Sequence, residues 1–132
     1  MLAPDFIKGI SLLGQYGFTY DILVFPHHLA AVLQMVEQCP DQSFVLDHMA
    51  KPLIKEKQIE EWRLGIQALA QHKNVFCKLS GLITEADWNY YTEADLKPYI
   101  DTIVLAFGID RIMFGSDWPV CCLLYTSDAA DE

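Results

Sequence analysis

The sequence lacks an excess of positive charge. Its 132 residues contain 9 lysines and arginines against 18 aspartates and glutamates, which gives a formal net charge of −9 at pH 7. Because phosphate-rich partners are bound through basic surface, this balance argues against nucleic acid or an anionic membrane as the main partner. The composition instead favours a small-molecule partner.

The sequence also has no long apolar run and no cysteines in a CxxC arrangement. No apolar segment approaches the roughly 20 residues that span a bilayer, and the N-terminus lacks the basic-then-apolar pattern of a signal peptide. We therefore expect a cytoplasmic protein without a membrane partner. The sequence contains no CxxC pair, so neither a zinc knuckle nor a disulfide framework is indicated, and we expect free thiols. The cysteines are Cys39, Cys77, Cys121 and Cys122.

What the sequence does contain is a regular alternation of apolar patterns. A length of 132 residues allows one domain at most, and a hydrophobic content of 52% excludes a disordered tail or linker. Short apolar runs predict buried strands at 21–25, 43–47, 75–79 and 111–114. The first run is nearly continuous, which is typical of a strand buried on both faces. Amphipathic helices are expected before the first strand and between the others, with a longer loop at 82–91.

Polar side chains follow each predicted strand. His27 and His28 follow the first strand, His48 the second, Ser80 the third, and Asp117 the last. The strands are roughly 25 to 35 residues apart, as right-handed crossovers between parallel strands require. All these exits should therefore lie at one edge of an α/β sheet. The pattern fits half of a (β/α)8 barrel or a small open doubly wound sheet, and the spacing does not choose between them.

Each candidate also has an ordinary structural explanation. A histidine after a strand is more often a loop hydrogen-bonding residue, and Asp117 could equally be a turn or N-cap residue. Trp88 in the long loop is better explained by packing than by substrate contact. Cys77 and Lys78 lie in the middle of a predicted strand, so we expect a buried thiol and a lysine in the barrel interior or at its bottom edge.

Three segments of the chain together resemble a known family, the amidohydrolase-related sugar lactonases to which L-fuconolactonase and L-rhamnonolactonase belong. They are FVLDHMAKP at 44–52, VFCKLSGLITEADW at 75–88 and RIMFGSDWPV at 111–120. They occur in order and with suitable spacing. The resemblance implies strands five to eight of a distorted (β/α)8 barrel, with residues 1–121 as the C-terminal half of the barrel domain.

The resemblance also implies a function and roles for individual residues. The implied reaction is hydrolysis of a sugar lactone to the aldonic acid. Asp117 is similar to the strand-eight aspartate that activates the attacking water, and His48 to the strand-six histidine that assists it. His27 or His28 is the candidate for the strand-five histidine. The expected substrate-binding residues are His27, His28, Ser80 and Trp88.

A single divalent, zinc-like ion is an open alternative to metal-free chemistry. Its candidate ligands are His27, His48 and Asp117, and such an ion lowers the pKa of its bound water. A lactone can also be opened by a carboxylate base, with polar groups that hold the carbonyl. A metal-dependent decarboxylase or amidase of the same superfamily therefore stays an alternative, as does a fragment without activity of its own.

The sequence departs from the family pattern at both ends. The strand-one His-x-His pair and the first four strands are absent, and residues 122–132 resemble the translation of a transposon-end adapter used in sequencing libraries. We expect this tail to be non-native. A half barrel exposes two sheet edges and an apolar inner face, so we expect the isolated chain to be aggregation-prone or partly ordered, and inactive alone.

Overall fold

The computed structural model of the protein describes residues 1–122, and these residues form one sheet of four parallel strands. The strands pair in chain order, so each strand is hydrogen-bonded to the strand that follows it in the sequence. The prediction of a parallel sheet is therefore confirmed. The strands are β1 (Tyr20–Ile22), β2 (Phe44–Leu46), β3 (Val75–Leu79) and β4 (Ile112–Phe114).

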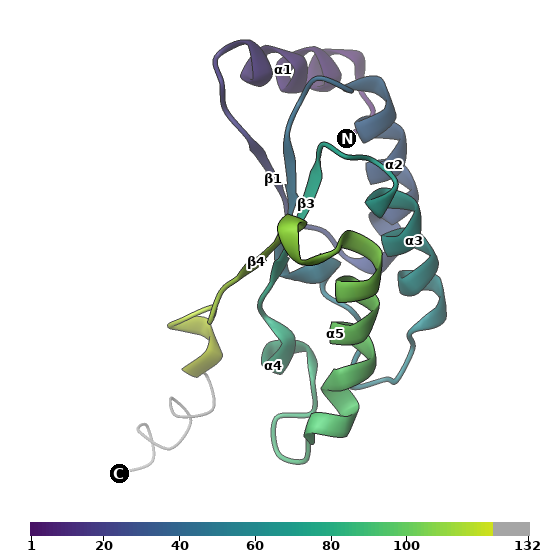
Figure 1. Cartoon of the computed structure of the whole chain (residues 1–132), viewed down its shortest axis with the longest axis vertical. Helices are drawn as coiled ribbons and strands as arrows, with labels where there is room; N and C mark the ends of the chain where they lie inside the picture. Colours follow the sequence, from purple (N-terminus) through teal and green to yellow (C-terminus); the bar gives the residue numbers. More distant parts are fainter. Residues whose placement is uncertain (123–132) are drawn as a thin grey trace.

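Helices connect the strands over one face of the sheet (Figure 1). α1 (Pro4–Gln15) precedes the sheet, and α2 (Leu29–Gln38), α3 (Glu60–Ala70) and α5 (Glu93–Phe107) are the three crossovers. An open doubly wound sheet carries helices on both faces and reverses its strand order. Sequential order with the crossover helices on a single face is the arrangement of consecutive barrel units, so the structure is half of a (β/α)8 barrel.

The start and the buried stripe of α5 follow directly from its sequence. Thr92 and Asp95 are spaced as in a capping box, and the backbone N–H and the hydroxyl of Thr92 donate to Asp95 Oδ2 over 3.0 and 2.7 Å. Tyr99, Ile103 and Phe107 then recur on one face of the helix and are buried. The helix therefore packs its apolar stripe against the rest of the domain, as the periodicity predicted.

The hydrophobic core lies between the sheet and the helices. Trp62 of α3 is its largest fully buried side chain, and its indole N–H donates to the Met49 carbonyl over 2.6 Å. The rest of this layer consists of strand side chains on the face of the sheet that the helices cover and of helix side chains that point toward the sheet. Those that are fully buried include Val32, Met35, Phe44, Leu46, Ile66, Leu69, Val75 and Cys77.

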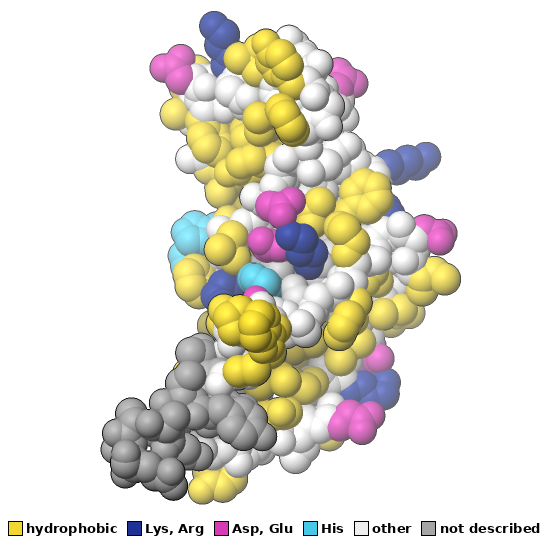
Figure 2. All heavy atoms as spheres, turned by 90° about the vertical axis from the view of Figure 1, so that its left-hand side faces the viewer, with side chains coloured by type: hydrophobic (Ala, Val, Ile, Leu, Met, Phe, Trp, Pro, Cys, Tyr) yellow, Lys and Arg dark blue, Asp and Glu magenta, His cyan; other side chains and the backbone are white. Residues whose placement is uncertain are grey.

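The opposite, inner face of the sheet is not covered by helices in the described part of the chain, and Figure 2 shows hydrophobic, histidine and charged side chains exposed there. The prediction that 21–25 is buried on both faces is wrong, since Leu23 is 61% and Phe25 46% exposed. The predicted burial of 111–114 is likewise wrong, because Phe114 is 84% exposed. Leu23 and Phe25 follow the edge strand β1, Phe114 ends the edge strand β4, and within residues 1–122 no second layer packs on them.

The first, second and last strands are shorter than the predicted runs, and the long loop is not entirely irregular. The loop at 82–91 contains a short helix, α4 (Leu82–Glu85). The last strand begins after Arg111, whose guanidinium group donates to the carbonyl oxygens of Ala70 and His72, each over 2.9 Å. Arg111 thus closes the C-terminal end of α3, because the last carbonyl groups of a helix have no partner inside it.

Two further expectations concern the ends of the chain and its location. Residues 123–132, which make up nearly all of the tail expected to be non-native, lie outside the described residues. That expectation stays a prediction. In residues 1–122, no helix combines the length and the apolar character that crossing a membrane requires.

The packing of α3 predicts a sharp difference between two positions on this helix. Ile66 is fully buried and Leu64 is 65% exposed. We expect Ile66→Ala to lower the free energy of unfolding by about 2–5 kcal/mol, because the lost methyl groups leave a cavity. Leu64→Ala should change it by no more than about 0.5 kcal/mol. Urea unfolding followed by circular dichroism measures both, and equal losses would contradict the assigned core.

Candidate active site

Three of the predicted side chains meet at the carboxyl-end edge of the sheet. His48 follows β2, Ser80 follows β3 and Asp117 follows β4. His48 Nδ1 lies 2.8 Å from Ser80 Oγ, and His48 Nε2 lies 3.7 Å from Asp117 Oδ1. Ser80 is buried, whereas the other two side chains are partly exposed. One imidazole ring therefore faces a hydroxyl group through one nitrogen and a carboxylate through the other.

An unusual backbone conformation turns the chain at this point. The four consecutive residues from His48 to Lys51 have φ angles between 46° and 57°, and Asp117 has a φ of 60°. Left-handed backbone costs a non-glycine residue roughly 1–2 kcal/mol. Such strain persists only where the surrounding contacts hold the chain in place, and it is concentrated at functional sites.

Gly81 allows the imidazole ring to come close to the end of β3. Its φ is +67°, and a Cβ atom at this position would lie 3.0 Å from Cβ, Cγ and Nδ1 of His48. A side chain at this position would therefore require the imidazole ring to shift by a few tenths of an ångström. Gly81 is not among the predicted site residues, although the Ser-Gly pair at the strand exit is a sequence signal for it.

A charged cluster lies on the inner face next to this site. Lys78 Nζ lies 2.5 Å from Asp21 Oδ2 and 2.8 Å from Asp47 Oδ1. The hydrogen bond to Asp21 and then the ion pair with Asp47 raise the pKa of Lys78. The ammonium group is thus charged at neutral pH. The charged Lys78 ammonium group contributes fully to stability at pH values below the ordinary lysine pKa. This contribution is lost as the pH rises through the raised pKa of Lys78.

The structure also confirms the expectations for the cysteines. Cys77 is fully buried in β3, and this burial raises the pKa of its thiol to about 12. The thiol therefore stays protonated at neutral pH and is not a nucleophile. All four cysteines are free.

His27 and His28 form a separate group around Phe25. The His27 ring stacks on Phe25 with the ring planes 6° apart, and His28 Nδ1 accepts a hydrogen bond from the Phe25 backbone over 3.3 Å. Lys51 Nζ lies 5.8 Å from the centroid of the Phe25 ring, and Lys51 is also ion-paired with Glu85. In residues 1–122 no hydrogen bond joins either histidine to His48.

Trp88 lies apart from the His48 group. Its indole N–H donates to the Thr84 carbonyl over 3.1 Å, and the ring is 46% exposed. It lines a hollow of about 340 Å³ with residues that include Leu53 and Asp87. Its expected contact with substrate stays a prediction.

A metal ion would need more ligands than this edge of the sheet supplies. His48 Nε2 and Asp117 Oδ1 are close enough to approach one ion, but zinc takes at least three protein ligands. No group of three potential ligands is arranged around one point within residues 1–122. The third candidate, His27, lies in the Phe25 group. The described residues therefore do not fit a complete metal site, and we derive no step through a metal.

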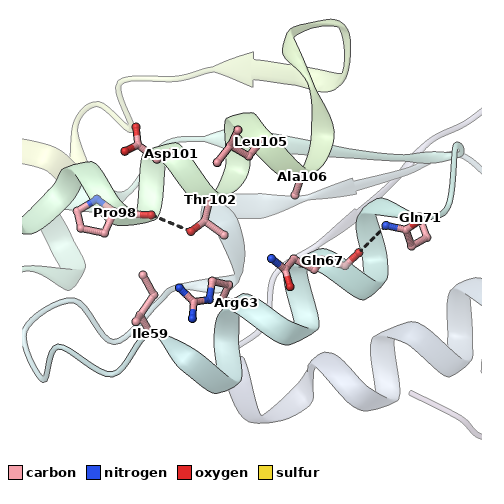
Figure 3. Close-up of a pocket in the computed structure, with 9 residues that line it drawn as sticks. All are labelled: Ile59, Arg63, Gln67, Gln71, Pro98, Asp101, Thr102, Leu105 and Ala106. Atoms are coloured by element: carbon pink, nitrogen blue, oxygen red, sulfur yellow. Dashed lines mark hydrogen bonds between the residues drawn. The ribbon is translucent and has the colours of Figure 1, made fainter.

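A larger hollow of about 680 Å³ lies on the helical side of the molecule, between α3 and α5 (Figure 3). Two of its polar groups are already used within their own helices. Thr102 Oγ1 donates to the Pro98 carbonyl over 2.8 Å, and Gln71 Nε2 donates to the Gln67 carbonyl over 3.3 Å. Because it contains none of the predicted site residues, we place the candidate site at the strand edge.

Comparison with known proteins identifies the family of the chain. A family model described as Amidohydrolase matches residues 2–131. The chain belongs to this amidohydrolase family. It is 42% identical over 120 residues to an L-fucono-1,5-lactonase of Burkholderia ambifaria, covering 89% of this chain and 40% of that protein. It is 38% identical over 133 residues to an L-fucono-1,5-lactonase of Burkholderia multivorans, covering 94% and 45%.

The fold comparison agrees with the sequence comparison. A crystal structure of an amidohydrolase from Burkholderia multivorans with bound zinc matches with a TM-score of 0.85 and 38% identity, covering 97% of this chain and 48% of that one. The chain thus spans less than half the length of the relatives it matches. The amidohydrolase fold and family expected from the sequence motifs are confirmed.

Gly81 provides a test of the site geometry. We expect Gly81→Ala to lower the free energy of unfolding by about 1 kcal/mol or more, because alanine is strained at this φ and its methyl group meets His48. Gly9→Ala in α1 is the matched control. A Cβ at Gly9 meets nothing within 4 Å, so this change should stabilise the protein by about 0.5–1 kcal/mol. Chemical denaturation measures both, and a neutral Gly81→Ala would contradict the close approach.

Proposed function

We propose that this chain supplies part of an active site that hydrolyses a sugar lactone to the corresponding aldonic acid. The observation that carries the proposal is the arrangement of His48 between Ser80 and Asp117 at the carboxyl-end edge of a half barrel. Active sites of barrel enzymes lie at this edge. The relatives named L-fucono-1,5-lactonase, at 38% and 42% identity, support a lactone as the substrate class.

Asp117 is the proposed general base. Its carboxylate takes a proton from water while the water oxygen forms a bond to the lactone carbonyl carbon. The tetrahedral intermediate then collapses, and the ring C–O bond breaks. The proton passes to the departing ring oxygen, which becomes the hydroxyl group of the open-chain acid. No oxidant or reductant is needed, since the net change is the addition of one water molecule.

His48 is proposed to assist by holding the reacting oxygen near Asp117. The separation of 3.7 Å between Nε2 and Oδ1 is longer than a hydrogen bond, so both atoms remain able to bind the same water molecule. Ser80 binds the other ring nitrogen and fixes the plane of the imidazole. This orientation is what a small catalytic group needs to work at one defined point.

The zinc ion in the related Burkholderia multivorans structure favours a second candidate, a metal-dependent amidase or decarboxylase. Residues 1–122 offer two of the ligands that such a reaction needs, His48 and Asp117. Removal of metal by a chelator separates the two candidates. In a protein that joins this chain to the remaining strands of a barrel, hydrolysis of a lactone that survives chelation supports the metal-free proposal.

The proposed role of Asp117 can be tested by fragment complementation. We expect residues 1–132 alone to show no hydrolysis of L-fuconolactone, because the chain spans less than half of its lactonase relatives. Mixing with the preceding half of the Burkholderia multivorans lactonase should restore acid release, which a pH indicator follows. Asp117→Asn should then reduce the rate by about 100-fold or more.

Asp110→Asn is the matched control for this experiment, because Asp110 is an exposed carboxylate just before β4. It should leave the restored rate unchanged. Hydrolysis by the unmixed chain, or a restored rate that Asp117→Asn leaves intact, would contradict the proposal.

A further inference from the structure

Two cross-strand pairs lie one after the other where β2 and β3 end. Asp47 is ion-paired with Lys78 over 2.8 Å, and the next residue, His48, lies 2.8 Å from Ser80. Alternate residues of a strand point to the same face, so Lys78 and Ser80 both lie on the inner side of the sheet. In the first pair, Lys78 thus binds Asp47, the residue that directly precedes His48.

The Lys78 contact at Asp47 holds the start of the turn, whereas the Trp62 indole N–H holds its Met49 carbonyl, one residue after His48. Regular pairing between β2 and β3 ends at Leu46 and Cys77, and the left-handed run begins at His48. Asp47 is therefore the only residue between the last paired position and the strained turn. Gly81 leaves the imidazole room to approach Ser80, but it supplies no group that holds the backbone of the turn.

Lys78 also reaches the third strand in this row. Its ammonium group contacts Asp21 in the middle of β1 as well as Asp47 just after β2, so one cation links three neighbouring strands. The lysine side chain is 33% exposed and that of Asp47 18%. Partial burial reduces solvent screening, which makes this pair stronger than a fully exposed one.

We propose that Lys78 is a positioning residue for His48. By binding Asp47, it holds the end of β2 so that the imidazole stays between Ser80 and Asp117. The contact with Asp21 anchors the lysine but does not act on His48. This role concerns the imidazole itself and does not depend on which substrate the complete site accepts, so it can fail or hold independently of the lactonase proposal.

The test measures the chemical accessibility of each histidine. Diethyl pyrocarbonate modifies imidazole nitrogens, and mass spectrometry of peptides gives a separate rate for each site at a protein concentration low enough to limit association. We expect Lys78→Met to raise the rate at which diethyl pyrocarbonate modifies His48 by roughly threefold, because a partly exposed ion pair is lost. His27 and His72, which lie outside the pair, should keep their rates.

Two variants of the same cluster are the controls. Lys78→Arg keeps a cation that can bind both carboxylates, so His48 should be modified at the wild-type rate in this variant. Asp21→Asn removes the other ion pair and leaves the contact with Asp47, so it should also leave His48 unchanged. A role limited to linking strands predicts instead that Asp21→Asn and Lys78→Met act alike.

Several results would overturn the proposal. One is an unchanged modification rate of His48 in a Lys78→Met protein that far-ultraviolet circular dichroism shows to be folded. Others are an equal increase in Asp21→Asn and a parallel increase at every histidine. If Lys78→Met does not fold, Asp47→Asn decides by the same measurement, because it removes the charge and keeps the size of the side chain. A His48 rate that stays at the wild-type value in Asp47→Asn would then reject the role of Lys78.

Discussion

Parallel pairing of four short strands is the constraint on which the rest of this structure depends. β1, β2 and β4 contribute only three residues each, yet their register places Ile22, Leu46, Cys77 and Ile112 in one row. Because every strand runs in the same direction, every exit lies at the same edge of the sheet. The polar groups that end the strands are thus brought together by backbone hydrogen bonds, before any side chain of the site contributes.

The two faces of the sheet carry opposite kinds of interaction. The outer face packs fully buried apolar side chains against α2, α3 and α5 and supplies most of the stabilisation. The inner face holds an ionic cluster around Lys78, strained backbone at His48 and exposed apolar residues such as Phe25. The hydrophobic layer therefore offsets the cost of a site that is charged and conformationally strained. This division is what the family fold requires, since its chemistry takes place at the strand ends.

Sequence patterns predicted part of the site for a physical reason. His48, Ser80 and Asp117 follow apolar runs, and residues after parallel strands share an edge, so their convergence could be expected. The same rule grouped His27 and His28 with them, but these rings lie against Phe25. Sharing an edge brings residues within the same region, whereas hydrogen bonding depends on backbone angles that the pattern does not contain. The left-handed turn at His48 and the close approach of Gly81 belong to this second kind of information.

The sequence by itself determined the alternation of strands and helices, the parallel direction of the strands, the capping of α5 and the family. These features depend on local periodicity, on turn residues and on short motifs, all of which are written in neighbouring positions. The family motifs also implied the half barrel. Only the tertiary structure decided that Leu23 and Phe114 are exposed and that Lys78 joins Asp21 to Asp47. Burial and ion pairing depend on which groups from distant parts of the chain come into contact, and that is settled only when the strands have paired.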